Sequence, residues 1–175
     1  MREKINPEIL KEYFTYDQNT GKLYWRVFRN SQAMKNQEAG GVGTGGYRRV
    51  KIMGRLYPNS HIVFALCYGR YPDKFLDHVD QDKLNNRIDN LREATRPENG
   101  FNRGKNKNNS SGFKGVNYHK KDKLFVARIG VENNRVRLGA YSTSEEAALA
   151  YNFAAVHFHG EFARLNNINL CGEIT

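Results

Sequence analysis

Cysteine is scarce in this chain, since only Cys67 and Cys171 occur among its 175 residues. Two cysteines cannot form the disulfide framework of a small secreted domain, and their spacing indicates no cysteine-based zinc site. Cys67 falls in the apolar run 62–68, which favours a buried free thiol. The scarcity indicates a reducing compartment, and we expect a cytoplasmic protein.

Long apolar runs are also lacking. None approaches the ~20 residues that a membrane-spanning helix needs. The opening residues Met1–Lys4 lead into no apolar core of a signal peptide. The sequence therefore predicts no membrane partner and no targeting segment.

Positive charge is abundant. The net charge is +10 and the isoelectric point is about 9.7, which favours a polyanionic partner, because lysine and arginine release condensed counterions when they neutralise phosphates. Hydrophobic residues make up 39% of the chain and aromatic residues 12%. This content is enough for one medium domain or two small ones, each with a modest core.

The first hundred residues alternate short apolar runs with glycine-rich turns. The pattern predicts a helix from Asn6 to Phe14, with Asn6 as its cap, and a short buried helix over 60–68. Strands are expected over 21–27 and 47–52.

The segment 104–112 contains no apolar side chain and is expected to be a linker. After it, strands are expected over 114–119, 124–130 and 135–139. Thr143 and Glu146 form a capping-box pattern that opens an alanine-rich helix ending near Phe158. This region predicts three antiparallel strands packed on one helix.

The central stretch carries the chemistry. Asp77 and His78 lie on or beside an expected strand, Asn90 begins a second, and Asn99 falls in the first turns of an expected helix. His78 precedes Asn90 by 12 residues, and Asn90 precedes Asn99 by 9. This arrangement resembles the HNH nucleases, which have a ββα-metal fold, and above all the homing endonucleases of phages and mobile introns. Upstream segments around residues 13–25 and 46–50, and His61, are also similar to those enzymes.

The resemblance implies a role for each residue. His78 would be the general base, because a neutral imidazole near pH 7 suits the activation of water. Asp77 and Asn99 would hold a divalent metal that relieves charge on the leaving 3′ oxygen. Asn90 would brace the loop and help to orient the base.

Two positions depart from the letters of the HNH motif: Asp77 stands first, and Asn99 replaces the last histidine. Both changes replace nitrogen ligands with oxygen. Oxygen ligands favour a single Mg²⁺ or Mn²⁺ over Zn²⁺. No small-molecule cofactor is expected.

Several neighbours have structural as well as functional interpretations. Asp80 is expected to serve a turn or an ion pair, and Asn85 and Asn86 are expected to be turn residues, with Asn86 buried in backbone hydrogen bonds. The cations Arg87 and Arg92 either meet phosphates or pair with acidic neighbours, Asp82 and Asp89.

The region after residue 110 resembles the plant ethylene-response-factor (AP2) DNA-binding domain over residues 111–166. The resemblance rests on 114–116, 127–129, 138–141, 145–151 and 158–166. In that family the sheet enters the major groove. Asn117 and Arg137 stand where the plant domain usually has arginine and tryptophan, so the plant target sequence is not carried over.

The candidate DNA-binding residues form two sets, of which the resemblance implies the first. Those expected to face DNA from the sheet are Asn117, His119, Lys123, Arg128, Arg135 and Arg137. Those expected to meet phosphates rather than to read sequence are Lys105, Lys107, Lys114, Lys120 and Lys121. Arg103 is a further candidate for phosphate contact, as are Arg87 and Arg92 under the first of their two interpretations.

The sequence thus predicts an α+β protein: a ββα-metal nuclease domain with a β-rich extension over 1–103, a linker over 104–112, an AP2-like domain over 113–166, and a tail over 167–175. The expected function is that of a metal-dependent, homing-type DNA endonuclease that acts on double-stranded DNA as a monomer or weak dimer. One alternative is a sequence-specific DNA-binding regulator with a degenerate HNH domain. Another is a basic structural or RNA-associated protein, which leaves the Asp77-His78 arrangement unexplained.

Overall fold

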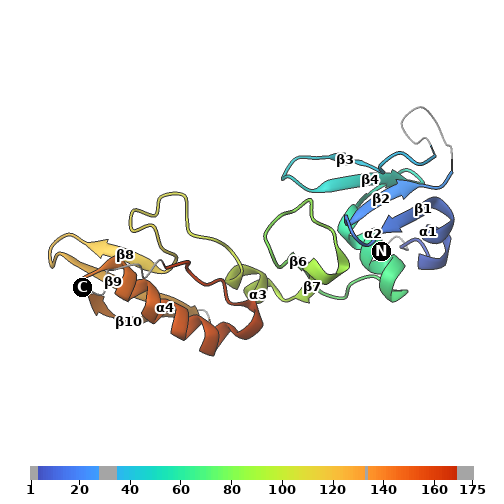
Figure 1. The fold of residues 1–175 in the computed structure, drawn as a ribbon. Helices are drawn as coiled ribbons and strands as arrows, with labels where there is room; N and C mark the ends of the chain where they lie inside the picture. Colours follow the sequence, from blue (N-terminus) through green and yellow to red (C-terminus); the bar gives the residue numbers. More distant parts are fainter. Residues whose placement is uncertain (1–3, 28–34, 133, 169–175) are drawn as a thin grey trace. The chain divides into compact units, whose positions relative to one another are not determined.

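The computed structural model describes residues 4–27, 35–132 and 134–168. The chain divides into two compact units, Met1–Arg96 and Pro97–Thr175 (Figure 1). Helices and small antiparallel sheets occur in both, so the predicted mixed α+β class is confirmed.

The first unit contains two helices, seven short strands and a 3-10 turn within its described residues. Their bounds are α1 Pro7–Tyr13, β1 Phe14–Asp17, β2 Lys22–Trp25, β3 Gly41–Val42, β4 Arg48–Ile52, β5 Arg55–Pro58, α2 Asn59–Tyr68, β6 Phe75–His78, η1 Ile88–Asn90 and β7 Leu91–Ala94. The predicted Asn6 cap is confirmed, because its side chain accepts the Glu8 backbone N–H.

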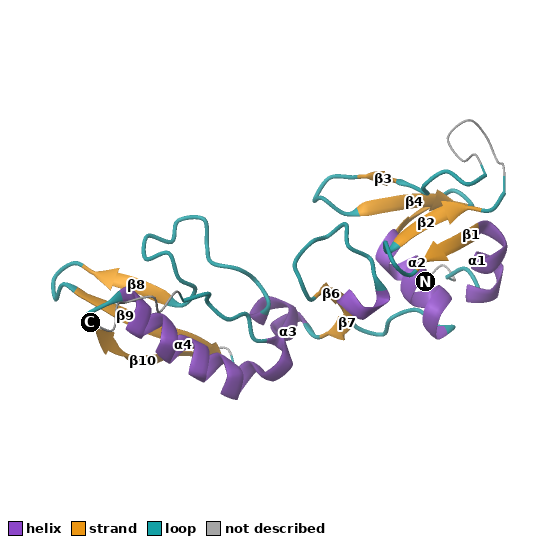
Figure 2. Ribbon diagram, viewed as in Figure 1, coloured by secondary structure: helices purple, strands orange, loops and turns teal. Residues whose placement is uncertain are grey.

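Antiparallel pairing builds three small sheets in this unit, with strand orders β1-β2, β3-β4-β5 and β6-β7. All of these strands except β5 are labelled in Figure 2. Large side chains from α1, α2 and the sheets form one core, which includes Leu10, Leu23, Trp25, Ile52 and Ile62. The core excludes water because each of these side chains is at most 4% exposed.

The β6–β7 hairpin lies at the end of this unit, and its register pairs Asp77 with Arg92 and His78 with Leu91. A polar loop, residues 79–90, joins the two strands. Asn90 ends the 3-10 turn of this loop, and β7 begins one residue later than the sequence pattern predicts. Helix α3, Arg96–Phe101, follows directly in the chain.

The second unit contains the expected three-stranded sheet and one long helix. Its strands are β8 Val116–His119, β9 Leu124–Val131 and β10 Asn134–Tyr141, in the antiparallel order β10-β9-β8. Helix α4, Ser144–His159, packs along all three strands, and η2, Gly160–Phe162, follows (Figure 2). The Thr143–Glu146 capping box is present at the start of α4.

Small residues let α4 approach this sheet closely. Ala127 on β9 and Ala147 and Ala148 on α4 are fully buried. Gly115 has a φ of +77°, and a Cβ there would lie only 2.1 Å from the Tyr151 ring. Both the backbone conformation and the space therefore require glycine at this position.

Two further expectations concern Cys67 and the C-terminal tail. The buried thiol expected at Cys67 is wrong, because α2 turns this side chain outward and leaves it exposed. Residues 169–175 of the predicted tail lie outside the described residues. In the part of the chain that the structure describes, no helix is long and apolar enough to cross a membrane.

Candidate active site and nucleic-acid interface

Asp77 is held by a cross-strand arginine. Its side chain is 5% exposed, and its Oδ2 accepts hydrogen bonds from Arg92 Nε at 3.0 Å and Arg92 Nη2 at 2.9 Å. The pairing follows from register, because Arg92 is the direct β7 neighbour of Asp77. Arg92 therefore fixes the carboxylate and balances its charge, and its partner is neither Asp82 nor Asp89.

His78 is buried at the end of β6 and touches a side chain from the loop. Its Nε2 lies 3.1 Å from Asn86 Oδ1, and the Tyr47 ring lies beside the imidazole, with 5.9 Å between ring centroids. Asn86 is itself only 3% exposed. The imidazole is thus held by side-chain contacts and by its place at the strand end.

Asn90 joins the two ends of the loop. Its Oδ1 accepts the Asp80 N–H, and its Nδ2 donates to Asp80 Oδ1 and to the Asn85 carbonyl oxygen. Its own carbonyl oxygen accepts the Val79 N–H at 3.0 Å. These four bonds cross-brace the residues that directly follow His78.

Asp80 serves this turn, as the sequence predicts. It accepts hydrogen bonds from the side chains of Asn85 and Asn90 and from the Asp82 N–H. Partial burial raises the pKa of Asp80, but these hydrogen bonds outweigh burial and hold the pKa below its usual value. The carboxylate is therefore charged while it organises the loop.

The expectation for Arg87 left two partners open, and the structure pairs it with Asp89. Arg87 Nη2 lies 2.7 Å from Asp89 Oδ2, and Arg87 Nη1 donates to the Asn19 carbonyl oxygen. Because the Arg87–Asp89 pair is exposed, solvent screens its electrostatic energy.

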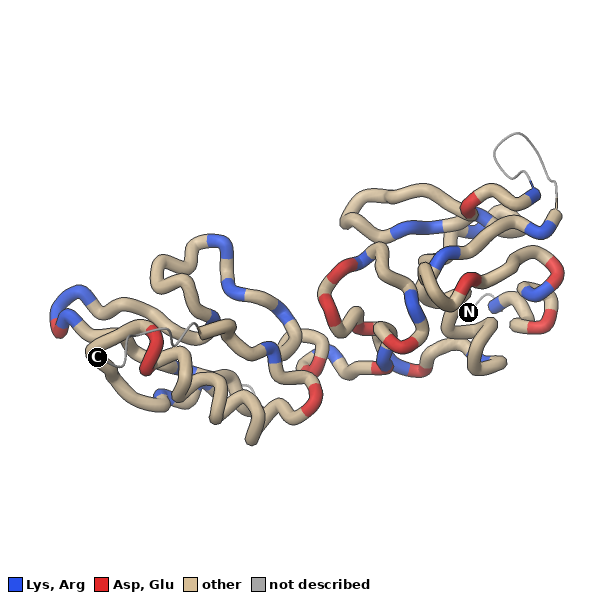
Figure 3. Tube along the Cα trace, in the orientation of Figure 1, with Lys and Arg blue, Asp and Glu red and all other residues tan. Residues whose placement is uncertain are grey.

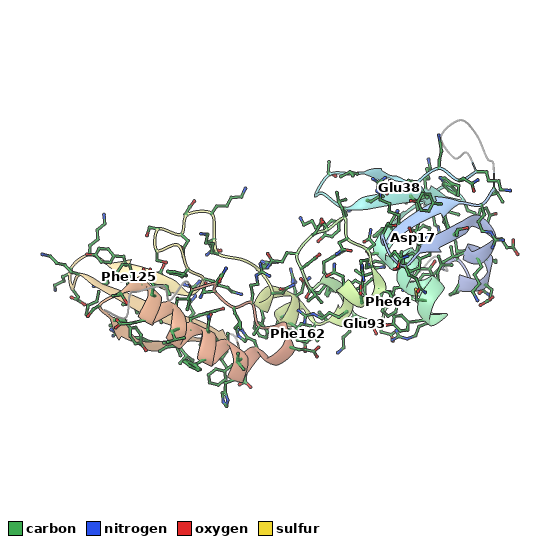
Figure 4. The ribbon with its side chains drawn as sticks, viewed as in Figure 1. Asp17, Glu38, Phe64, Glu93, Phe125 and Phe162 are labelled. Atoms are coloured by element: carbon green, nitrogen blue, oxygen red, sulfur yellow. The ribbon has the colours of Figure 1, made fainter. Side chains whose placement is uncertain are left out.

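A second arginine secures the start of the hairpin. Arg70 makes two hydrogen bonds to the carboxylate of Glu93 on β7, and Glu93 also accepts the N–H groups of Asp73 and Lys74. Glu93 and Phe64 are labelled in Figure 4, and the Arg70 guanidinium lies 5.2 Å from the Phe64 ring centroid. The hydrogen bonds from Arg70 are the largest cause of lowering the pKa of Glu93 to about 2.

Asn99 lies on α3, and its side chain is half-buried. Within the second unit, Phe101 of this helix stacks on His159, with ring centroids 3.8 Å apart and an interplanar angle of 5°. Lys114 Nζ donates a hydrogen bond to the Phe101 carbonyl oxygen. His159 of α4 and Lys114, which lies just before β8, therefore hold the helix that carries Asn99.

The Asp77 carboxylate is the type of ligand that a hard divalent cation takes. Mg²⁺ is usually held by one or two carboxylates, with water and substrate phosphates completing its ligands. Asp77 is such a carboxylate, and Arg92 donates two hydrogen bonds to its Oδ2. No cluster of three or more His, Cys, Asp or Glu side chains suited to a metal occurs among the described residues.

The sheet of the second unit presents a polar face opposite α4. Cross-strand register pairs Arg128 with Arg137 and Gly130 with Arg135, and directly paired residues share a face. Asn117 and His119 lie on the same face by alternation along β8. Five of the six predicted DNA-facing residues are thus together, while Lys123 lies in the turn before β9 and not in a strand.

The arginines of this face are available for a partner. Arg128, Arg135 and Arg137 are exposed, and among the described residues no carboxylate lies within 4.0 Å of their guanidinium groups. His119 differs, because its Nδ1 lies 3.1 Å from Asp122 Oδ2. Further cations lie along the loop after α3 and at the β8–β9 turn (Figure 3). They are Arg103, Lys105, Lys107, Lys120, Lys121 and Lys123.

Lys114 differs from these cations because its side chain is directed into the unit. Its ammonium bonds to the Phe101 carbonyl oxygen and lies 5.9 Å from the Tyr151 ring centroid. Burial, and to a lesser degree Arg164, lowers its pKa to about 8. Its observed contacts are structural, and its expected contact with phosphate remains a prediction.

Sequence reasoning did not anticipate the Asp77–Arg92 pair or the contact between Asn86 and His78. The Asp77–Arg92 pair follows from the strand register of the hairpin, in which Arg92 stands opposite Asp77 and residues 79–90 form the connecting loop. The second depends on the path of a 12-residue loop, for which local sequence carries no signal.

Comparison with known proteins supports the nuclease interpretation of the hairpin region. A family model described as HNH endonuclease matches residues 57–101, from β5 to the end of α3. The chain is 34% identical over 131 residues to an uncharacterized HNH endonuclease, L560, of Acanthamoeba polyphaga mimivirus, which covers 73% of this chain and 66% of that protein. It is 32% identical over 109 residues to Protein 3.8 of Escherichia phage T7, covering 61% of this chain and 89% of that protein.

A second group of relatives consists of plant transcription factors. The chain is 31% identical over 152 residues to the AP2-like ethylene-responsive transcription factor CRL5 of Oryza sativa subsp. japonica. The match covers 81% of this chain but only 22% of the plant protein. The chain therefore belongs to the HNH endonuclease family and combines an HNH domain with an AP2-like DNA-binding domain.

Proposed function

We propose that this protein is a divalent-metal-dependent, homing-type DNA endonuclease whose AP2-like sheet selects the target in double-stranded DNA. The observation that carries the proposal is the buried Asp77–His78 pair at the end of β6, followed by a loop that Asn90 braces. Burying two polar side chains at consecutive strand positions costs free energy, which Arg92 and Asn86 offset in part, and such a cost is expected at a catalytic centre.

In the proposed reaction, His78 accepts a proton from a water molecule as the water oxygen attacks the scissile phosphorus. The bond between phosphorus and the 3′ oxygen breaks, and the departing oxygen takes a proton from solvent water, which leaves a 5′-phosphate and a 3′-hydroxyl. A positioned base of this kind contributes roughly 10²–10⁴-fold to the rate. Asn90 acts through His78, because it holds the loop that follows the base.

Asp77 and Asn99 would hold Mg²⁺ or Mn²⁺, and the assignment of Asn99 rests on the spacing of the family motif. The ion would stabilise the negative charge that develops on the leaving 3′ oxygen. Arg92 orients the Asp77 carboxylate through its hydrogen bonds to Oδ2.

Target binding is assigned to the exposed face of the second unit. Arg128, Arg135 and Arg137 are free of carboxylate partners among the described residues, so they lose no ion pair when they meet DNA. Asn117 and His119 on the same face are proposed to contact base edges. Arg103, Lys105, Lys107 and Lys123 are proposed to meet phosphates, which adds affinity without sequence preference.

The test is a digest of whole genomic DNA with the full chain and Mg²⁺, followed by sequencing of the cleavage ends. We expect ends enriched at one sequence, lost on chelation of the metal. The His78→Ala variant should leave no enriched ends while it still binds the same site. One digest thus reports activity, site and the number of strands cut.

A second function is favoured by one observation, the pairing of Asp77 with Arg92. If Arg92 keeps the Asp77 carboxylate from binding a metal, the protein is a sequence-specific DNA-binding regulator with an inactive HNH domain. Specific binding with no metal-stimulated cleavage of any DNA would establish that function and overturn the first.

We further propose that the protein acts in the cytoplasm of a bacterial host as a monomer or weak dimer. Its similarity to a protein of phage T7 supports the host assignment.

A further inference from the structure

The amide of Asn86 has a defined orientation in the loop. Its Nδ2 donates to the Leu84 carbonyl oxygen at 3.4 Å, and its Oδ1 therefore faces His78 Nε2 at 3.1 Å. The opposite orientation would place two carbonyl oxygens against each other. The hydrogen-bond network thus assigns the amide oxygen to the histidine.

This orientation determines the tautomer of the buried imidazole. An amide oxygen accepts hydrogen bonds and cannot donate them, so Nε2 of His78 must carry the proton. In the neutral ring the other nitrogen, Nδ1, is then the basic atom. A hydrogen bond at one ring nitrogen thereby selects the nitrogen that can accept a proton from water.

We infer that Asn86 is a positioning residue of the nuclease, which holds His78 as its Nε2–H tautomer and directs Nδ1 to the reacting water. The inference rests on the proposed function, and it gives Asn86 a role that a turn residue does not have. Asn86 acts through His78 and touches neither substrate nor metal in this scheme.

The backbone of Asn86 has an anchor of its own, which supplies a matched control. Tyr16 on β1 donates its hydroxyl to the Asn86 carbonyl oxygen at 3.4 Å and accepts the Ile88 N–H at 2.9 Å. A Tyr16→Phe variant therefore loosens this part of the loop without altering the amide. Asn86→Leu removes the amide at nearly constant size, and Asn86→Asp keeps an acceptor oxygen.

The first measurement is nitrogen-15 NMR of the full chain with labelled histidine, without metal or DNA. We expect a slowly exchanging proton on His78 Nε2, assigned by its loss in His78→Ala. Asn86→Asp and Tyr16→Phe should retain this proton signal, and Asn86→Leu should lose it. If the wild-type protein lacks the signal, the inference is overturned without recourse to any variant.

The second measurement is single-turnover cleavage of supercoiled plasmid DNA that contains the mapped target site, with saturating Mg²⁺. We expect Asn86→Leu to lower the maximal rate by roughly ten- to a hundredfold, part of what a positioned base contributes, and to leave the DNA concentration for half-saturation unchanged. Tyr16→Phe should stay within about threefold of wild type, since it leaves the amide and the base in place. Trp25 fluorescence, from the single tryptophan and within the same unit, verifies that each variant is folded.

The outcomes separate this inference from the proposed function. Cleavage that is equally fast in Asn86→Leu, with the variant folded, overturns the role of Asn86 and leaves the nuclease intact. A protected Nε2 proton in a protein that cuts no DNA overturns the nuclease and leaves the Asn86–His78 bond in place.

Discussion

The two units hold their functional side chains in opposite ways. In the first unit, Asp77 and His78 are buried. A hydrogen bond from Arg92 restrains Asp77, and a hydrogen bond to the amide oxygen of Asn86 restrains His78. In the second unit, Arg128 and Arg137 are exposed, and among the described residues they pair with no carboxylate. Chemistry requires groups restrained in one geometry, whereas recognition of a polyanion requires cations whose charge no neighbour has neutralised.

The sharpest test of this division is His78→Ala. We expect the cleavage rate to fall by about 10²–10⁴-fold, because the general base is lost, with no change in DNA affinity. Rates are measured under single turnover and affinities by titration with calcium in place of magnesium. His157→Ala, on an exposed position of α4, is the control and should cut normally. Persistent cleavage by His78→Ala would remove the imidazole from the mechanism.

The cores of the two units should also respond separately. Leu23 is 1% exposed in a core of large side chains, so Leu23→Ala should lower the free energy of unfolding of the first unit by about 2–5 kcal/mol. Trp25 fluorescence follows this unit alone, while far-ultraviolet circular dichroism is weighted towards α4. Leu56→Ala, at a side chain that is 59% exposed, is the control. A parallel shift of both transitions would mean that the units unfold together.

On the exposed sheet face of the second unit, each arginine should contribute separately to the free energy of DNA binding. Arg128→Ala or Arg137→Ala should each weaken DNA binding by about 1–3 kcal/mol if the arginine reads a base. Arg128→Lys, which keeps the charge, should restore binding only where the contact is to phosphate. Arg164→Ala, an exposed cation outside the sheet, is the control. If these variants abolish cleavage at saturating DNA, binding and chemistry are not separable.

The smallest expected effect concerns the acid stability of the hairpin. The pKa of Glu93 is lowered to about 2, chiefly by its hydrogen bonds with Arg70. The stabilisation is therefore present above the ordinary pKa of glutamate and is lost as the pH falls from about 4.5 towards 2. Glu93→Gln should flatten this dependence in Trp25 fluorescence, by less than about 1 kcal/mol because the group is solvent-screened. Glu8→Gln, from the exposed pair with Lys11, is the matched surface control for the Glu93 substitution.

Local sequence predicted most elements because their signals are local. The Asn6 and Thr143 caps, helix α2 and the three strands of the second unit follow from residues within one or two turns of each other. The exposure of Cys67 was not predictable in this way. An apolar run indicates that a helix is buried but not which of its faces meets the core, and that face depends on the packing of the whole unit.

The Asp77–His78 pair, with Asn90 and Asn99 at their spacing, was evident from the sequence alone, because a motif is a property of order along the chain. How the pair is held was decided by tertiary structure. Arg92 reaches Asp77 through strand register, and Asn86 reaches His78 because a polar loop folds back on the hairpin. Side-chain contacts across strands and loops depend on distances in space, and the order of residues does not specify those distances.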